Sequence, residues 1–377
     1  MLHPEGKAGV MRGLRYGVCG AGLLVAALCA GAVSQESMPS QDAAAAFAVS
    51  GDIRGTHDPA IAKDGDTYYV FATGVAGIVG VGDGEGSRWR LPQIPIRCSA
   101  DLLVWRRCGA VFARMPEWIR ARSPRTAELW APDVSFFAGE FHLYYAYSVF
   151  GKNTSGIGLA TNRTLDAVSP EYKWVDRGMV LQSGLADDFN AIDPNVVLDG
   201  DKAWLSFGSF WTGIKMRRLD MLSGLLSRED LRVFALASRN AKAEGPRDPN
   251  LPPDTEAIEA PFVFQHDGWF YLFVSWDLCC RGVKSTYQER VGRSRSVTGP
   301  YVDREGRSML EGGGTQVLAA NATWVGPGGA SLLHLPGEDV MVFHAYGAKD
   351  GAASLQVSRV VWRDGWPVVE WGLAPHS

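Results

Sequence analysis

The sequence predicts an all-β fold, a five-bladed β-propeller in a single domain, and three observations support this. The 377 residues include 44 glycines and 13 tryptophans, which indicates many turns and many aromatic strands rather than a helical bundle. One sequence phrase occurs five times along the chain. Each copy of the phrase contains turn residues typical of a β-hairpin.

The five copies share a polar or proline-containing entry, a short apolar strand, a turn and an aromatic strand. They span residues 57–74, 130–148, 191–210, 258–277 and 325–346. Their prolines are spaced 62 to 73 residues apart, at Pro59, Pro132, Pro194, Pro261 and Pro327. Further short strands such as "GIGLATN" lie between the copies. Repeats of this length, each holding several strands, fit blades of four-stranded sheet around one axis.

The N-terminus has the features of a secretory signal peptide. Three basic residues precede a short apolar run, and Ala30-Gly31-Ala32 matches a cleavage pattern. The predicted units are a signal peptide (1–32), a flexible leader (33–50) and the propeller (51–377). We therefore expect an exported protein, periplasmic or secreted, with no membrane attachment after cleavage.

Charge and cysteine content narrow the class of protein further. The net charge of −4 is spread along the chain without a basic stripe, so we expect no nucleic-acid partner. Four cysteines lie outside the predicted signal peptide. Cys98 and Cys108 flank a predicted turn that a disulfide could join, whereas the adjacent Cys279 and Cys280 form either a vicinal disulfide or two buried thiols. No His stands at zinc-ligand spacing from that pair.

Acidic residues occur at the start of three repeats. In a propeller the innermost strand of every blade points one end at the central funnel, so residues at the repeat starts should converge there. Asp58, Asp193 and Glu259 occupy such starts. Asp133 lies out of register with them and is interpreted as structural or as an orienting residue.

Carboxylates that face each other across a sugar-sized gap are typical of glycoside hydrolysis, in which one protonates the leaving oxygen and another activates water. A third acid near the proton donor raises the donor's pKa. An Asp before Pro more often caps local backbone amides, but three acids at repeat starts favour a site. Aromatic residues at repeat starts or loops could stack on sugars: Trp130, Phe150, Phe210, Trp211 and Trp276.

These segments together resemble glycoside hydrolase family 43, and within it most closely the endo-1,5-α-L-arabinanases. The resemblance covers about residues 52–372 and rests on "HDPAI", "LWAPDVSFF", "NAIDPN", "GSFWTGIK", "IEAPFVF" and "CCRG". It implies a five-bladed propeller that hydrolyses α-1,5-linked arabinofuranose with inversion, and therefore an arabinan substrate.

The resemblance also implies roles for individual residues. Asp58 would be the general base, Glu259 the general acid, and Asp193 the residue that tunes the pKa of the acid and orients it. For an inverting enzyme, the carboxyl groups of base and acid should lie roughly 6.5–9.5 Å apart. Candidate substrate-binding residues are His57, Trp130, Phe150, Gly151, Asn190, Ala191, Ile192, Ser209, Phe210 and Trp211.

Two features depart from the pattern of the family. Arabinanases of this kind commonly read "GPGH" in the last blade, where the His helps to hold a hydrated metal ion, but this chain reads "GPGG" and has Gly329 there. No cofactor is therefore expected to be required, and a central Ca²⁺ or Na⁺ is doubtful or would be held almost wholly by water. Residues 75–95 look like a Gly-rich insertion that could reshape the groove.

The alternatives to an endo-acting arabinan hydrolase come from two classes. Within the same fold, an exo-acting α-L-arabinofuranosidase or a β-xylosidase remains open. Outside the enzymes, a non-catalytic sugar-binding propeller would be expected to lack one essential acid, and all three acids are present. The oligomeric state is left open by the sequence.

Overall fold

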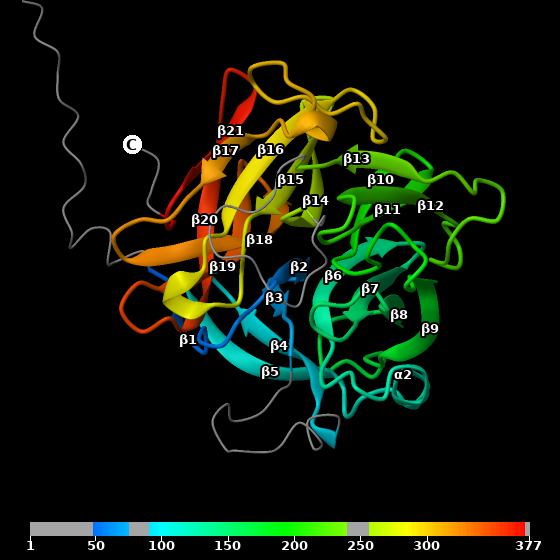
Figure 1. The fold of residues 1–377 in the computed structure, drawn as a ribbon. Coiled ribbons are helices and arrows are strands. Elements are labelled where there is room, and N and C mark those ends of the chain that lie inside the picture. Colours follow the sequence, from blue (N-terminus) through cyan, green and yellow to red (C-terminus); the bar gives the residue numbers. More distant parts are fainter. Residues whose placement is uncertain (1–47, 75–89, 240–255, 374–377) are drawn as a thin grey trace, which may run out of the picture. The chain divides into compact units, whose positions relative to one another are not determined.

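Five β-sheets surround one axis in the computed structural model, which describes residues 48–74, 90–239 and 256–373 (Figure 1). Each sheet is one blade, and the blades follow each other around the axis in chain order. The prediction of a five-bladed β-propeller is confirmed. All described residues belong to one compact unit.

The blades are built as follows. Blade 1 contains β1 (Ser50–Gly51), β2 (Ala60–Asp64), β3 (Thr67–Phe71), β4 (Gln93–Ser99) and β5 (Val104–Phe112). Blade 2 contains β6 (Trp130–Phe137), β7 (Glu140–Tyr147), β8 (Gly156–Asn162) and β9 (Val175–Gln182). Blade 3 contains β10 (Asn195–Asp199), β11 (Lys202–Phe207), β12 (Ile214–Leu219) and β13 (Phe234–Ala237). Blade 4 contains β14 (Ile258–His266), β15 (Trp269–Trp276), β16 (Gln288–Ser294) and β17 (Thr315–Leu318). Blade 5 contains β18 (Trp324–Leu335), β19 (Glu338–Gly347), β20 (Ala353–Arg363) and β21 (Trp366–Glu370).

Little helix is present among the described residues. A short helix α2 (Glu117–Arg122) lies between blades 1 and 2, and the 3-10 turns η2 (Gly282–Lys284) and η3 (Met309–Glu311) belong to loops of blade 4. No helix within the described ranges is long and apolar enough to cross a membrane.

The hydrophobic core is divided into five clusters, and each cluster lies between two neighbouring blades. One joins blades 1 and 2 through residues such as Phe71 and Leu143, and another joins blades 5 and 1 through Val70 and Leu355. The remaining three fill the spaces between blades 2 and 3, 3 and 4, and 4 and 5. Each sheet is therefore buried on both faces, which explains the near-continuous apolar character of strands such as "YLFV".

The chain enters each innermost strand in the same unusual conformation. At this entry point, one residue of each blade has a positive φ: Asp58 (46°), Ala131 (41°), Asp193 (55°), Ala260 (50°) and Gly329 (63°). These five residues surround a narrow waist on the axis. In four blades a proline follows, but in blade 5 the counterpart is Ala330, so Pro327 is not the equivalent proline that the sequence suggested. The register shift between Gly328 and Ser331 corresponds to the shifts in β6 and β14, but β18 has an additional one between Val325 and Gly328, which contains Pro327.

The ring is closed by segments near the two ends of the described chain. β1 adds to the outer edge of blade 1 as a parallel partner of β5. Residues 53–55 then pair with β20 of blade 5, where the Gly55 N–H donates to Ala353 O (2.8 Å) and the Leu355 N–H to Ile53 O (2.9 Å). Blades 1 and 5 are thus joined by backbone hydrogen bonds as well as by the core between them.

Both pairs of cysteines are joined. Cys98 and Cys108 link β4 to β5, and Cys279–Cys280 is a vicinal disulfide in the loop after β15. For Cys279 and Cys280 the sequence allows either a disulfide or two thiols, and the structure has the disulfide. The predicted signal peptide, most of the leader and most of the 75–95 insertion lie outside the described residues, while Ser50, assigned to the leader, is the first residue of β1.

Candidate active site

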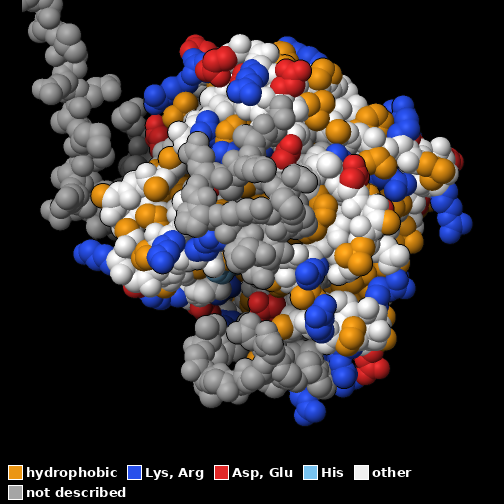
Figure 2. Space-filling model, in the orientation of Figure 1, with side chains coloured by type: hydrophobic (Ala, Val, Ile, Leu, Met, Phe, Trp, Pro, Cys, Tyr) orange, Lys and Arg blue, Asp and Glu red, His pale blue; other side chains and the backbone are white. Residues whose placement is uncertain are grey.

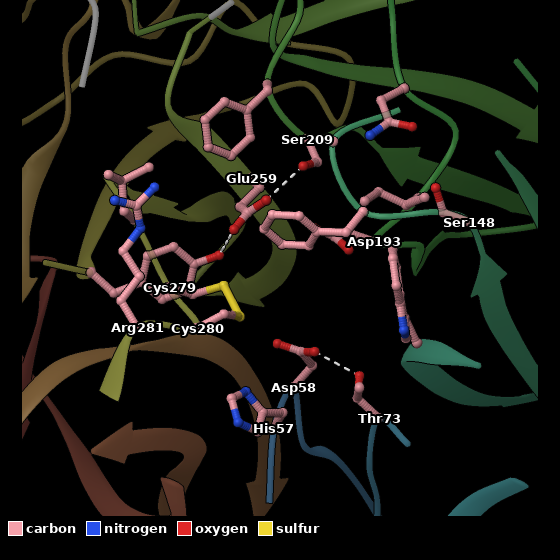
Figure 3. Close-up of a pocket in the computed structure, with 18 of the residues that line it drawn as sticks. His57, Asp58, Thr73, Ser148, Asp193, Ser209, Glu259, Cys279, Cys280 and Arg281 are labelled. Carbon is pink, nitrogen blue, oxygen red and sulfur yellow. Dashed lines mark hydrogen bonds between the residues drawn. A yellow bond between two sulfur atoms is a disulfide. The ribbon is translucent and has the colours of Figure 1, made fainter. Parts of the chain in front are cut away.

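A pocket of about 510 Å³ lies at one end of the propeller axis, and residues from all five blades line it (Figure 3). Asp58 comes from the start of blade 1, Asp193 from the start of blade 3 and Glu259 from the start of blade 4. The structure thus brings the three acids into one pocket, although 135 and 66 residues separate Asp58 from Asp193 and Asp193 from Glu259.

Asp58 is held by contacts on both its side chain and its backbone. Thr73 Oγ1 donates to Asp58 Oδ2 (2.6 Å) and accepts a hydrogen bond from Ala131 N (2.7 Å). The Asp58 N–H donates to His344 Nδ1 (3.1 Å). The positive φ of Asp58 turns this residue out of the strand direction, and Figure 3 shows its carboxylate facing the open pocket.

Glu259 is nearly buried, with 8% of its surface exposed, and both of its oxygens are hydrogen-bonded. Ser209 Oγ donates to Oε2 (2.5 Å) and the Tyr287 hydroxyl donates to Oε1. Burial raises the pKa of Glu259 to about 7, and the charge of Asp58 acts in the same direction, while the Ser209 hydrogen bond opposes them. Glu259 is therefore an acid that keeps its proton in mildly acidic solution.

Asp193 lines the same pocket as the other two acids. Burial raises the pKa of its carboxyl well above the usual value, and the charges of Glu259 and Asp58 raise it further. One hydrogen bond, from Ala260 N to Asp193 Oδ2 (3.1 Å), favours the ionised form. Because Asp193 and Glu259 interact strongly, their protons leave in steps that belong to the pair rather than to either residue.

This arrangement is suited to acid–base chemistry on a neutral substrate. A group that holds a proton near pH 7 faces a pocket that also contains a hydrogen-bonded carboxylate. The first can protonate a leaving oxygen and the second can take a proton from water.

The sequence predicts ten substrate-binding residues. In the structure, nine of the ten line this pocket. The nine are His57, Trp130, Phe150, Gly151, Asn190, Ile192, Ser209, Phe210 and Trp211. Ala191 does not line it: this residue is fully buried in the hydrophobic cluster between blades 2 and 3, and its N–H donates to Ser183 Oγ (2.9 Å). The Ile192 N–H donates to Asn190 O (3.0 Å), which closes a tight turn at Ala191, so Asn190 and Ile192 line the pocket while Ala191 packs into the core.

Two polar or aromatic candidates differ in how they are placed. The Oδ1 atom of Asn190 is buried and has no hydrogen-bond partner among the described residues, so a substrate hydroxyl could satisfy it. Trp276, also considered as a sugar platform, is not in the pocket lining. Its ring instead lies under the guanidinium groups of Arg239 and Arg290, at 4.8 and 4.6 Å.

Several pocket residues were not anticipated from the sequence. They are Thr73, Tyr287, Tyr346 and the disulfide Cys279–Cys280, together with His344 immediately behind Asp58. None of them starts a repeat. Tyr287 reaches the pocket from the loop before β16, and His344 and Tyr346 reach it from β19. For His344 and Tyr346, the two aromatic polar residues at the end of "VMVFHAY" are a signal that could have drawn attention to them, as the "CCRG" motif could for the cysteines.

Asp133, interpreted as structural or orienting, lies outside this pocket. Its carboxylate accepts hydrogen bonds from Asn195 Nδ2 (2.9 Å) and Val196 N (2.9 Å), both in blade 3. Asp133 therefore ties the innermost strands of blades 2 and 3 together below the waist.

The position expected to supply a metal ligand offers none. A Cβ on Gly329 would lie 3.1 Å from Asp58 Oδ1 and 3.1 Å from His344 Nδ1, but glycine has no donor atom there. His344 does not replace the missing ligand, because its Nδ1 accepts the Asp58 N–H and its Nε2 lies 3.3 Å from the Tyr346 hydroxyl. Within the described ranges, no three His, Cys, Asp or Glu residues are placed to hold a metal. The residues present do not fit a protein-ligated central ion.

The surface around this end carries both signs of charge. Figure 2 shows Lys and Arg side chains dispersed over the visible face, with Asp and Glu between them and hydrophobic side chains throughout. Neither sign forms a continuous field there.

Comparison with protein families gives one decisive match. The model of the family "Glycosyl hydrolases family 43" matches residues 53–367, a range that reaches into all five blades. The chain belongs to glycosyl hydrolase family 43. It is therefore a glycoside hydrolase, and the resemblance inferred from the sequence motifs is confirmed.

Named relatives are similar over most of their length. The chain is 40% identical to an extracellular exo-α-(1→5)-L-arabinofuranosidase of Cellvibrio japonicus, over 83% of this chain and 86% of the relative. It is 36% identical to the extracellular endo-α-(1→5)-L-arabinanase 1 of Bacillus subtilis, over 91% and 95% of the two chains. A solved structure of the Cellvibrio cellulosa α-L-arabinanase complexed with arabinohexaose has 38% identity and a TM-score of 0.73, covering 84% of this chain and 95% of that one.

Proposed function

We propose that the protein hydrolyses α-1,5-linked L-arabinofuranosidic bonds of arabinan with inversion of configuration. The observation that carries the proposal is the pocket itself, in which Glu259 has a pKa of about 7 and shares the space with the carboxylate of Asp58. The names of the family 43 relatives, which act on α-(1→5)-arabinan linkages, support this substrate.

In the proposed mechanism, Glu259 gives its proton to the glycosidic oxygen of the leaving sugar. Asp58, held by Thr73 and the His344 ring, takes a proton from a water molecule that attacks the opposite face of the anomeric carbon. After the reaction Glu259 has lost a proton to the leaving sugar and Asp58 has gained one from water. Exchange of protons with the solvent restores both carboxyl groups to their starting states. Asp193 acts through the coupled titration of the pair: burial and the charges of Glu259 and Asp58 raise its own pKa, and the protons that leave in steps are shared between Asp193 and Glu259.

Replacement of the proposed acid is the direct test. Glu259→Gln should abolish hydrolysis of linear arabinan, but an aryl arabinofuranoside with a good leaving group should still be cleaved because it needs little protonation. Glu289→Gln is the matched control: Glu289 is buried in the same blade, burial raises its pKa to about 8, and it does not line the pocket. Wild-type turnover of arabinan by Glu259→Gln would remove Glu259 from this role.

The stereochemical outcome tests the role of Asp58. Proton NMR during the first minutes of the reaction should show the β-anomer as the initial product, and Asp58→Ala should be inactive on arabinan and on aryl substrates alike. Initial release of the α-anomer would mean retention, and Asp58 could not then act as the base for water.

We further propose that the enzyme attacks internal bonds. The endo-arabinanase of Bacillus subtilis, matched over 91% of this chain, supports this mode, whereas the exo-arabinofuranosidase of Cellvibrio japonicus, 40% identical, supports release from a chain end. Products from debranched arabinan distinguish the two. A mixture of short oligosaccharides at early times is expected, and a single small product of fixed length would establish exo action.

Export is part of the same proposal. Both relatives are named as extracellular, and the first 32 residues have the features of a signal peptide. Sequencing of the mature N-terminus after expression with its own leader should give a start near Val33.

A further inference from the structure

We propose that the vicinal disulfide Cys279–Cys280 is a positioning element of the active site, which acts through Tyr346 on His57 and on the proposed base Asp58. This inference rests on the proposed function of Asp58. Both cysteines line the same pocket as the acids, and Figure 3 shows the disulfide between Glu259 and His57.

The disulfide loop is bonded directly to Tyr346. The Cys280 N–H donates to the Tyr346 hydroxyl oxygen (2.8 Å), and that oxygen lies 3.9 Å from Cys280 Sγ. Tyr346 is itself buried, with 2% of its surface exposed, at the end of β19 in blade 5. Its hydroxyl also lies 3.3 Å from His344 Nε2 and 3.4 Å from His57 Nδ1. One oxygen atom thus joins the loop of blade 4 to two histidines.

The hydrogen-bond directions in this group follow from the Asp58 backbone. The Asp58 N–H donates to His344 Nδ1, so this nitrogen carries a lone pair and the neutral ring has its proton on Nε2. Burial lowers the pKa of His344 to about 3, which is consistent with a neutral ring. Its Nε2–H then donates to Tyr346, as the Cys280 N–H does.

With two N–H groups donating to the Tyr346 oxygen, its own proton is directed to His57 Nδ1 or to the side chain of Ser285, which also contacts this hydroxyl. In the arrangement in which Tyr346 donates to His57 Nδ1, His57 carries its ring proton on Nε2. The rings of His57, His344 and Tyr346 lie within 4.8 to 5.4 Å of each other, so none can turn freely. The loop therefore holds the hydroxyl group that contacts His57 Nδ1, and the Tyr346 ring packs against the His57 ring.

The conformation of the loop needs an external constraint. Cys280 has a φ of 66° and Asp277 a φ of 72°, a region that residues other than glycine rarely occupy. At its start the loop is held by the buried ion pair Arg239–Asp277 (2.7 Å). At Cys280 the constraint is the covalent link to Cys279. Without this link, Cys280 is free to return to a common backbone conformation, and its N–H would leave Tyr346.

The experiment compares two disulfide-free variants on a linear α-1,5-arabino-oligosaccharide. Cys279→Ser/Cys280→Ser should lower kcat/KM by about tenfold to hundredfold, since misplacing a catalytic group by about 1 Å costs about 10²-fold. Cys98→Ser/Cys108→Ser is the matched control, because it also removes a disulfide but lies outside the pocket lining, and it should keep wild-type kcat and KM. Wild-type kinetics of Cys279→Ser/Cys280→Ser would overturn the proposal.

A double-mutant cycle separates positioning from loss of structure. If the disulfide acts through the hydroxyl, Cys279→Ser/Cys280→Ser combined with Tyr346→Phe should be no slower than Tyr346→Phe alone. Additive losses would show that the disulfide does not act through Tyr346.

Reduction gives a second measurement if the serine variant does not fold. In Cys98→Ser/Cys108→Ser, dithiothreitol transfers two electrons and two protons to the vicinal disulfide and becomes a cyclic disulfide. Activity should fall and return on reoxidation, and unchanged activity with both thiols free would contradict the inference. Retained arabinan hydrolysis by Asp58→Ala, by contrast, would contradict the proposed function itself.

Discussion

Asp133 and Asp193 stand near the axis in neighbouring blades, and comparing them shows how the fold separates structure from chemistry. Burial raises the pKa of both carboxyls, that of Asp133 to about 6 and that of Asp193 well above its usual value. Asp133 follows the proline of its repeat and Asp193 precedes it. That shift of two residues along the chain moves the carboxylate from one side of the waist to the other.

The partners of the two carboxylates explain the different outcomes. Asp133 accepts hydrogen bonds from Asn195, Val196 and Ser135, so its charge is used to hold two blades together. Asp193 accepts from a single backbone amide and faces two other acids. A buried carboxylate with satisfied oxygens stabilises the fold, whereas one with like-charged neighbours shifts their proton affinity.

The largest expected effect is on catalysis by Asp193→Asn. The amide does not titrate, so the coupled proton exchange between residue 193 and Glu259 is lost, and kcat on arabinan should fall by about 10²-fold, within the range that general acid catalysis contributes. The thermal midpoint should not fall, because a buried group with a costly charge has been replaced by a neutral one. Steady-state kinetics and thermal unfolding measure the two effects, and a large loss of stability would place Asp193 with Asp133.

The reverse result is expected for Asp133→Asn. An amide oxygen can accept only part of what two carboxylate oxygens accept, so a buried donor of blade 3 is left unpaired, at a cost of about 1–3 kcal/mol in the free energy of unfolding. Values of kcat should stay within about threefold of wild type, since Asp133 is not in the pocket lining. Denaturant unfolding tests the first number, and a strongly reduced kcat in a stable variant would contradict the assignment.

A smaller effect is expected on the pH profile of Ser209→Ala. Because Glu259 works in its protonated form with a pKa of about 7, kcat/KM should fall as pH rises through that value. The Ser209 hydrogen bond favours the ionised form, so its removal should move the alkaline limb to higher pH by about one unit. Ser148→Ala is the control, since Ser148 lines the same pocket but bonds Ser155, and its limb should stay in place.

The smallest effect is expected from metal removal. The counterpart of Asp58 and Asp193 in blade 5 is Gly329, which supplies no ligand. Dialysis against a chelator should therefore leave kcat within about twofold of the untreated enzyme. Loss of activity that Ca²⁺ restores would show that an ion is held there by water and by groups not considered as ligands.

The fold was predictable because each copy of the repeated phrase specifies the same strand, turn and second strand. A turn glycine and a following aromatic strand recur at the same points of each copy, and closing five such units into a ring places their starts together. In the fifth copy, Pro327 resembles the proline of the other repeats, although the equivalent position is Ala330. The reason is that a β-bulge in β18 cannot be recognised from the sequence pattern alone.

The three acids were predictable because Asp58, Asp193 and Glu259 stand at repeat starts. Pocket residues at the ends of repeats or in loops, such as Phe150, Ser209 and Trp211, were predictable only from the family resemblance. Tyr287, Tyr346 and His344 approach from other strands and loops, and their contacts depend on how neighbouring blades pack. Ala191 shows the opposite error, since a motif does not say which of its side chains faces inward.

The pairing of residues 53–55 with blade 5 means that the active site needs both ends of the propeller. Asp58 belongs to blade 1, but His344, which contacts it, and strand β20, which pairs with residues 53–55, belong to blade 5. A nascent or truncated polypeptide that ends before Ala353 lacks the β20 residues that pair with residues 53–55. A fragment that lacks residues 53–58 or residues 344–355 is therefore not expected to retain a working active site.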